Sequence, residues 1–269
     1  MPPSPIIVTA IGGPTALLEI AGLRLLTDPT FDAPGRYPLG AITLTKQTGP
    51  AIAVDAIGRI DGVLLSHDHH LDNLDHAGRA LLPQARRVWT TRSGAGRLGG
   101  HAEGMAPWET AEITTPDHGV LRVTATPARH GPVGIEPITG EVIGFVLQTE
   151  AEDGAIYVSG DTVWYEGVAA IAHRFDVRLA ILFTGSAQPR GPFHVTMDSN
   201  DAIEAAHAFP AATIMAVHHD GWAHFTQSQA DLAQAFGVVG LAHRLRVLEP
   251  GVPETVVWGR GGVTGSVGA

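Results

Sequence analysis

Residues Val63–His76 read VLLSHDHHLDNLDH, and the interpretation of the whole chain starts from this stretch. Three aliphatic residues fit a buried strand, and the polar residues after them include four histidines and three aspartates. His67 and His69 are two residues apart, so an extended backbone would place both imidazoles on one side. Imidazoles beside carboxylates suit a divalent metal such as zinc. The density of ligands favours a metal site at a strand end over a solvated acidic turn.

The composition is that of a globular protein without disulfides. The chain has 269 residues, of which 44% are hydrophobic and only 16% are charged, so it can bury a substantial core. It contains no cysteine, which excludes disulfide bonds and thiolate metal sites. Any metal ligands must therefore be histidine, aspartate or glutamate, and the sequence supplies 14 histidines.

The charge balance narrows the choice of partners. A formal net charge of −10 repels phosphate backbones, so we expect no nucleic-acid partner. The N-terminal residues MPPSPIIVTA lack the pattern of a signal peptide. The sequence has no stretch of about twenty apolar residues, so we expect no stable membrane insertion. We expect a cytoplasmic protein with a small-molecule substrate. The sequence leaves open whether it forms a homo-oligomer.

Strand and helix signals run through the whole chain without a linker. Residues 6–28 predict three short strands separated by glycine turns, and the second half alternates strands with helices. No internal repeat of fixed short period is present. One domain over residues 1–269 is the simplest interpretation.

Three segments of the first half are harder to assign. Residues 29–53 are rich in Pro and Gly without a clear period, which predicts either a lid loop over a site or a disordered insertion. Residues 72–82 predict a helix capped by Asp72 or Asn73. The glycine-rich residues 92–119 predict loops and short turns.

Further candidate ligands occur where other predicted strands end. His130 lies in TATPARHG, Asp161 in AIYVSGDT, and His218 with His219 in IMAVHHDGWAHF. A single His or Asp at a strand end is more often a cap or a hydrogen-bonded core residue. Together with His67, however, these residues follow four strands whose ends one sheet edge could bring together, and that joint pattern predicts a metal centre.

The order of these motifs carries a resemblance to a known family. A histidine cluster followed by TPARHG, YVSGDT and AVHHDGW resembles the metallo-β-lactamase fold superfamily. Within it, the chain is most similar to the branch of metal-dependent hydrolases that contains L-ascorbate-6-phosphate lactonase and N-acyl-phosphatidylethanolamine phospholipase D. The resemblance implies an α/β (α+β) fold, a four-layer αββα sandwich of two mixed β-sheets with the metal centre along one edge.

The resemblance also assigns ligand roles. His67, His69 and His130 match the three histidines of the family's first metal site. Asp161 matches the aspartate that bridges both metals, and His218 matches the last histidine, a ligand of the second site.

The motif departs from the family at its end. The family pattern is H-x-H-x-D-H, whereas this chain has H-x-H-x-x-D-N. Either one residue is inserted, so that Asp72 serves as the aspartate and Asn73 replaces the final histidine, or His70 turns toward the second metal. Because an amide oxygen is a poorer zinc ligand than imidazole, we expect a weaker second site.

The expected activity is that of a metal-dependent, lactonase-like hydrolase. A metal-bound hydroxide would attack an ester, lactone or phosphodiester bond of the substrate. The protein would bind one or two divalent ions, which we expect to be zinc, with manganese or iron as alternatives. Asp161 would bridge the two ions that hold the hydroxide, and Asp68 or Asp72 would orient the water or a ligand imidazole. His194 or His224 would protonate the leaving group, unless these two histidines serve only as a helix cap or in loop packing. The alternative function is a catalytically weak or inactive protein that binds metal or senses a ligand.

Overall fold

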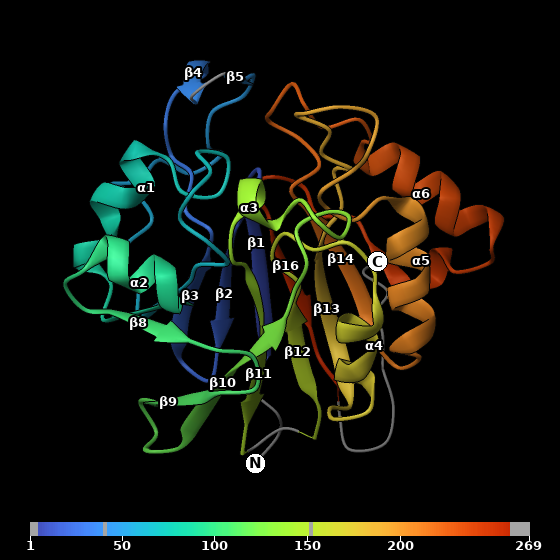
Figure 1. Ribbon diagram of the computed structural model, residues 1–269. Helices are drawn as coiled ribbons and strands as arrows, with labels where there is room; N and C mark the ends of the chain where they lie inside the picture. Colours follow the sequence, from blue (N-terminus) through green and yellow to red (C-terminus); the bar gives the residue numbers. More distant parts are fainter. Residues whose placement is uncertain (1–4, 40–41, 151–152, 259–269) are drawn as a thin grey trace.

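The structure, a computed structural model, describes residues 5–39, 42–150 and 153–258. Within this part of the chain, two seven-stranded β-sheets pack face to face, and helices cover both outer faces (Figure 1). The strands of the first sheet are, in order, β16 (Pro253–Val256), β1 (Ile6–Gly12), β2 (Thr15–Ile20), β3 (Leu23–Thr27), β6 (Gly62–Leu64), β7 (Arg87–Thr91) and β8 (Ala102–Met105). Those of the second are β15 (Leu245–Arg246), β14 (Thr213–Val217), β13 (Val177–Phe183), β12 (Ala155–Val158), β11 (Ile143–Thr149), β10 (Val120–Pro127) and β9 (Thr110–Thr114).

Both sheets are mixed. The antiparallel meander β1–β2–β3 continues into the parallel strands β6, β7 and β8, and the antiparallel strands β9 to β12 continue into the parallel strands β13, β14 and β15. Parallel strands are buried on both faces and are therefore apolar over their whole length. This explains the sequence VRLAILF of β13, in which six of the seven residues are buried.

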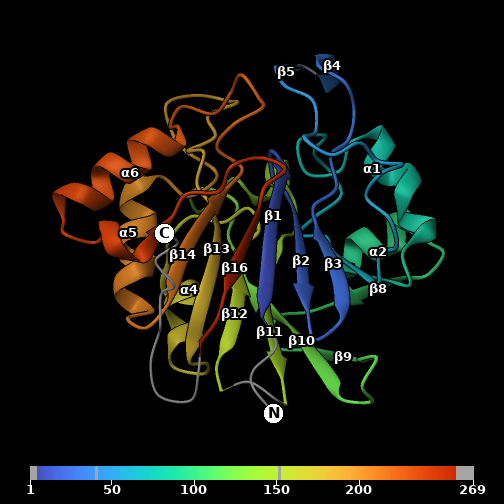
Figure 2. The ribbon, with the colours of Figure 1, turned by 180° about the vertical axis from the view of Figure 1, so that it is seen from behind.

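The helices lie in two outer layers, on opposite flanks of the sheets (Figures 1 and 2). The helices beside the first sheet are α1 (His76–Leu81) and α2 (Arg92–Leu98). Those beside the second sheet are α4 (Glu166–Ala172), α5 (Ser199–Ala208) and α6 (Gln229–Val238). The remaining short helical segments are α3 (Glu136–Thr139) and the 3-10 turns η1 (Leu82–Gln84) and η2 (Ala242–Arg244).

Three apolar layers hold the sandwich together. Side chains such as Leu18, Leu25, Phe145 and Leu179 form the core between the two sheets. A second cluster lies between the first sheet and α1, and a third between the second sheet and α4 to α6. This arrangement confirms the predicted αββα sandwich of two mixed sheets. Across the described residues, none of the helices has both the length and the apolar character needed to cross a membrane.

Local predictions in the first half need correction. Residues 29–53 are not irregular throughout, because they form the hairpin β4 (Gly35–Leu39) and β5 (Ile42–Lys46), whose residues 40 and 41 lie outside the described part. The helix expected over 72–82 begins at His76, since Asp75 rather than Asp72 or Asn73 caps it, accepting a hydrogen bond from the Gly78 N–H at 2.9 Å.

The glycine-rich segment 92–119 is also more regular than expected, since it contains α2, β8 and β9. Thr91 caps α2 by accepting a hydrogen bond from the Gly94 N–H. Arg97 in its last turn pairs with Asp68, which fixes the helix to the loop after β6. Tertiary contacts therefore stabilise a helix that its own glycines disfavour.

Candidate metal centre

Four strand ends bring the predicted ligands to one edge of the sandwich. The loop after β6 carries His67 and His70, and the loops after β10, β12 and β14 carry His130, Asp161 and His218. His67, His130, Asp161 and His218 are all at least 95% buried. The sandwich thus gathers residues that are up to 151 positions apart in sequence into one buried site.

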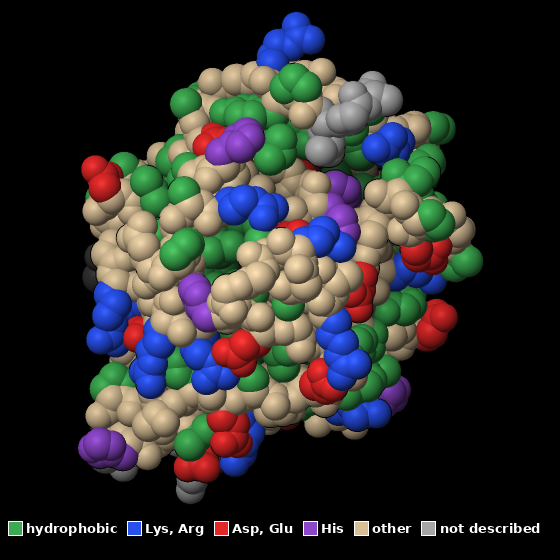
Figure 3. Space-filling model, turned by 60° about the vertical axis from the view of Figure 1, so that its left-hand side comes forward, with side chains coloured by type: hydrophobic (Ala, Val, Ile, Leu, Met, Phe, Trp, Pro, Cys, Tyr) green, Lys and Arg blue, Asp and Glu red, His purple; other side chains and the backbone are tan. Residues whose placement is uncertain are grey.

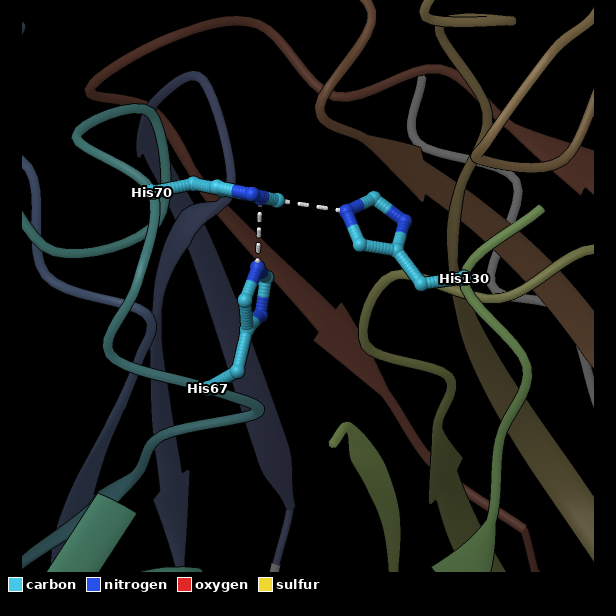
Figure 4. Close-up of side chains that lie close together, drawn as sticks. All are labelled: His67, His70 and His130. Atoms are coloured by element: carbon cyan, nitrogen blue, oxygen red, sulfur yellow. Dashed lines mark hydrogen bonds between the residues drawn. The ribbon is translucent and has the colours of Figure 1, made fainter. Parts of the chain in front are cut away.

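Three imidazoles converge at this edge (Figure 4). Nδ1 of His70 lies 3.0 Å from Nε2 of His67 and 3.2 Å from Nε2 of His130. The three nitrogen atoms lie within 4.8 Å of one another, close enough to bind one ion. We call His67, His70 and His130 the histidine cluster.

Protein contacts orient the rings of the cluster. The His130 Nδ1–H donates to the carbonyl oxygen of Val195 at 2.7 Å, which leaves the lone pair of Nε2 facing the cluster. His67 Nδ1 lies 2.9 Å from the Ser66 hydroxyl oxygen. Hydrogen bonds of this kind on the far nitrogen are typical of metal-binding histidines.

The electrostatics of the cluster suit metal binding. Burial and the neighbouring His130 lower the pKa of His70 to about 4, and burial and the neighbouring His70 hold the pKa of His67 well below its usual value. Both imidazoles are therefore neutral at pH 7. Neutral imidazole is the form that coordinates a metal.

Asp161 lies between the cluster and His218. Its Oδ2 is 3.5 Å from Nε2 of His130, and its Oδ1 is 2.9 Å from Nδ1 of His218. Burial alone would raise the pKa of Asp161, but His218, His130 and His67 lower it below the usual range. The group is an anion with imidazoles on both sides, which is the position expected for a bridging carboxylate.

His218 has a backbone conformation that is uncommon for a non-glycine residue, with φ of 59°. A hydrogen bond from its N–H to the Gly13 carbonyl oxygen, at 2.7 Å, holds this conformation. Its Nδ1 lies 2.9 Å from Oδ1 of Asp161, whereas its buried Nε2 has no hydrogen-bonding partner among the described residues and lies 3.7 Å from Oδ2 of Asp72. An unpartnered buried nitrogen is unfavourable unless something binds it. The residues at this edge therefore fit a metal ion.

A second pair of residues lies beside His218. Oδ2 of Asp72 is 2.9 Å from Nε2 of His224 and 3.7 Å from Nε2 of His218. Asn73, the residue after Asp72, donates from its amide to Oδ1 of Asp161 at 3.1 Å. The structure thus brings Asp72 and His224 to the site, and places an amide at the last motif position.

Two residues predicted for the site lie apart from it. His69 is half-buried beside Asp68, with its ring centroid 6.1 Å from that of His67, and it is not part of the cluster. His194 faces the N-terminus of α5, where its Nε2 is 3.2 Å from Oδ2 of Asp201, and it does not line the pocket.

Asp28 is a residue of the site that the sequence analysis assigned only to the end of a strand. It is 1% exposed, and its Oδ1 accepts a hydrogen bond from the Ser66 N–H at 2.6 Å. Burial and the neighbouring Asp161 raise its pKa to about 8. Like the other site residues it directly follows a strand, β3, and that shared position could have identified it.

The site opens into a pocket that encloses about 460 Å³ of empty space, its mouth included. Asp161 and the cluster residues His70 and His130 line it together with Asp72 and His224. The apolar side chains along its walls are Ile42, Leu44, Ile135, Ala187, Pro189 and Val195. Arg190 is exposed where it lines the pocket. On the face of the molecule shown in Figure 3, positive and negative side chains are interspersed rather than gathered by sign.

Comparison with known proteins identifies the family. The family described as "Beta-lactamase superfamily domain" matches residues 23–219, which include every member of the histidine cluster, Asp161 and His218. The chain belongs to this family. Its membership agrees with the fold and with the location of the candidate site at the edge of the two sheets.

Relatives within the beta-lactamase superfamily match most of the chain. The UPF0173 protein YddR of Bacillus subtilis is 25% identical over 252 residues, which cover 91% of this chain and 97% of YddR. A UPF0173 metal-dependent hydrolase of Pelotomaculum thermopropionicum is 29% identical over 205 residues, covering 72% of this chain and 81% of that protein.

Solved structures of the beta-lactamase superfamily fold show the same arrangement. An isothiocyanate hydrolase from Delia radicum gut bacteria superposes with a TM-score of 0.79 at 22% identity, covering 92% of this chain and 98% of that one. A possible metal-dependent hydrolase from Veillonella parvula superposes with a TM-score of 0.82 at 22% identity, covering 94% and 100%. At 22% identity, these superpositions show that the chain and the two solved structures share a fold.

Proposed function

We propose that this protein is a metal-dependent hydrolase of a small molecule. The observation that carries the proposal is the histidine cluster beside the ionised Asp161 at the base of a pocket. Support comes from the relatives, since the protein of Pelotomaculum thermopropionicum is named a metal-dependent hydrolase. We further propose that the chain belongs to the branch of the superfamily that contains lactonases and phosphodiesterases, and that its activity is of one of these kinds.

The residues that would hold the first ion are His67, His70, His130 and Asp161. With three imidazoles and a carboxylate, the set suits zinc, with manganese or iron as alternatives. Such an ion supplies a nucleophile at neutral pH, by lowering the pKa of water, and a Lewis acid for the substrate oxygen.

The remaining residues of the site position the substrate and the ligands. The Val195 carbonyl oxygen fixes the ring of His130, and Asn73 fixes Oδ1 of Asp161. The apolar walls, among them Ile42 and Leu44 of β5, exclude water from the bound substrate and favour an apolar substituent next to the scissile bond. His194 lies outside the pocket and has no part in this proposal.

The pocket favours an ester or lactone over a phosphodiester. Its walls are mainly apolar, and Arg190 is the only Lys or Arg side chain among the described residues that line it. A neutral carbonyl group fits such surroundings, whereas a phosphodiester would bring a charge among apolar side chains. The exposed Arg190 leaves room for an anionic substituent at a distance from the scissile bond.

Turnover of a substrate panel tests the proposal. Protein equilibrated with zinc or manganese is assayed on aryl esters, lactones, phosphodiesters and, because of the structural neighbour from Delia radicum gut bacteria, an isothiocyanate. We expect turnover of an ester or lactone that chelation removes, added metal restores and Asp161→Asn abolishes. Metal-loaded protein that is silent on the whole panel would instead support the metal-binding or ligand-sensing alternative.

A further inference from the structure

The last position of the metal motif holds an amide, and its contacts show what that amide does. Asn73 is fully buried, and its Nδ2 lies 3.1 Å from Oδ1 of Asp161 and 3.4 Å from Oδ2 of Asp28. Asp28 in turn accepts a hydrogen bond from the Ser66 N–H at 2.6 Å. Asn73 thus joins two buried carboxyl groups through its Nδ2, while its Oδ1 has no hydrogen-bonding partner in the described part of the chain.

An imidazole from another loop contacts Asp72, the motif residue that precedes Asn73. His224 comes from the loop after β14, the same loop that begins with His218, and its Nε2 is 2.9 Å from Oδ2 of Asp72. His218 directs its own Nε2 toward that oxygen, at 3.7 Å. Two imidazoles from one loop therefore converge on a single carboxylate oxygen.

Backbone contacts hold His224 in this place. The Ala223 N–H donates to the Thr45 carbonyl oxygen of β5 at 2.9 Å, and the Gln188 N–H donates to the His224 carbonyl oxygen at 3.0 Å. The ring of Phe225 packs against the His224 imidazole with centroids 4.6 Å apart. The His224 side chain is 11% exposed and lines the pocket, and its buried Nδ1 has no hydrogen-bonding partner within residues 5–39, 42–150 and 153–258.

We propose that His224 replaces the missing motif histidine as a ligand, so that Asp72, His218 and His224 hold a second ion with Asp161 shared between both ions. The proposal rests on the proposed function, because it needs the first ion at the histidine cluster. Imidazole is a better ligand than an amide for a divalent transition metal. Asn73 is then a positioning residue, which holds Asp161 between the two sets.

The experiment counts zinc ions per chain in the full-length protein. Each variant is equilibrated with excess zinc, freed of unbound zinc by gel filtration in a weak zinc-chelating buffer, and measured by elemental mass spectrometry, with circular dichroism as a check on folding. We expect two ions for the unchanged protein, one for His224→Ala and one for His224→Gln, which keeps a side chain of similar size. Asn73→Ala should keep two ions.

His194→Ala is the matched control. His194 is also an imidazole hydrogen-bonded to one aspartate oxygen, and with Asp198 and Asp201 it forms a second group with suitable ligand spacing, on the surface. We expect two ions for this variant. Loss of one ion here would place the second ion in the surface group and overturn the proposal.

The remaining outcomes separate the two proposals. Two ions in both His224 variants would overturn our assignment of His224. If Asn73→Ala then held only one ion, the amide oxygen of Asn73 would be the ligand. One ion in the unchanged protein would also overturn it, while leaving the proposed function intact. No ion in the unchanged protein would contradict the proposed function itself.

Discussion

His69 and His70 are adjacent in the chain, yet only His70 belongs to the histidine cluster. The family resemblance assigned His69 to the first metal site, in line with its spacing of two from His67, and left His70 as a candidate ligand of the second. In the structure it is the His70 ring whose Nδ1 lies 3.0 Å from Nε2 of His67 and 3.2 Å from Nε2 of His130. A turn begins at His70, whose carbonyl oxygen accepts hydrogen bonds from the N–H groups of Asn73 and Leu74, at 3.1 and 2.9 Å. Residues within three positions of a strand end, such as His67 and Asp161, could be predicted from sequence, whereas which of two neighbouring side chains in the loop faces the site could not.

The turn yields a prediction for the two histidines. Replacing a hydrogen-bonding partner of a metal ligand costs about 10- to 100-fold in affinity, so loss of a direct ligand should cost at least about 100-fold. We expect His70→Ala to weaken zinc binding by that amount and His69→Ala to change it less than tenfold. Competition with a fluorescent chelator measures both, and a larger effect for His69→Ala would refute the cluster.

The ion pair of His194 predicts a pH-dependent stability. Its hydrogen bond to Asp201 raises the pKa of His194 above the usual 6.5. The stabilisation is therefore present below pH 6.5 and is lost as the pH rises through the folded-state pKa. Because the ion pair is partly exposed, we expect it to contribute only about 0.5 kcal/mol to the free energy of unfolding. Urea unfolding should show His194→Gln less stable than the unchanged protein at pH 5.5 but equal at pH 8.5; an equal difference at both pH values would exclude the ion pair as the cause.

At the scale of elements, the hairpin β4–β5 is fixed to the body of the protein by a buried ion pair. Nζ of Lys46 at the end of β5 lies 3.0 Å from Oδ2 of Asp75, the cap of α1, and both side chains are at least 96% buried. Asp75 also accepts hydrogen bonds from the N–H groups of Asp32 and Gly78. Since β5 supplies Ile42 and Leu44 to the pocket, this pair positions one wall of the site.

Breaking that pair should destabilise the protein. Removing one partner of a buried ion pair costs about 3–5 kcal/mol, and the backbone donors that remain on Asp75 favour the lower end. We expect Lys46→Met to lower the free energy of unfolding by about 3 kcal/mol and to raise KM more than it lowers kcat. Arg122→Met, which breaks an exposed pair with Glu112, is the control and should cost less than about 1 kcal/mol. Equal losses in both variants would show that the Lys46 pair does not fix the hairpin.

Elements whose sequence pattern follows from burial were predicted well. The strands β1 to β3 alternate or repeat apolar residues between glycine turns, and the second half alternates strands with helices as the sequence predicts. The hairpin β4–β5 could not be predicted in this way, because its stability depends on a residue about thirty positions away. Its role as a lid stays a prediction.

At the scale of the molecule, the candidate metal centre joins both halves of the sandwich. His67 and His70 follow a strand of the first sheet, while His130, Asp161 and His218 follow strands of the second. A ligand that binds only the folded chain at about 1,000 times its Kd contributes about 4 kcal/mol of stability. A metal bound here should therefore stabilise the packing of the two sheets.

Removal of metal should lower the melting temperature. For a domain of this size, about 4 kcal/mol corresponds to a shift of roughly 10 °C. We expect chelation to produce that shift in the unchanged protein, and His70→Ala to show a much smaller one. Differential scanning calorimetry with and without chelator measures it, and equal shifts in both proteins would mean that the metal binds elsewhere.

Anomalous diffraction from zinc-loaded crystals tests the central claim most directly. The claim is that His67, His70 and His130, together with Asp161, form a metal centre at the edge of the two sheets. We predict an anomalous peak at the zinc edge that all three imidazoles contact, with His69 outside its coordination. A zinc peak only at His194, Asp198 and Asp201, or a peak coordinated by His69 in place of His70, would contradict the account.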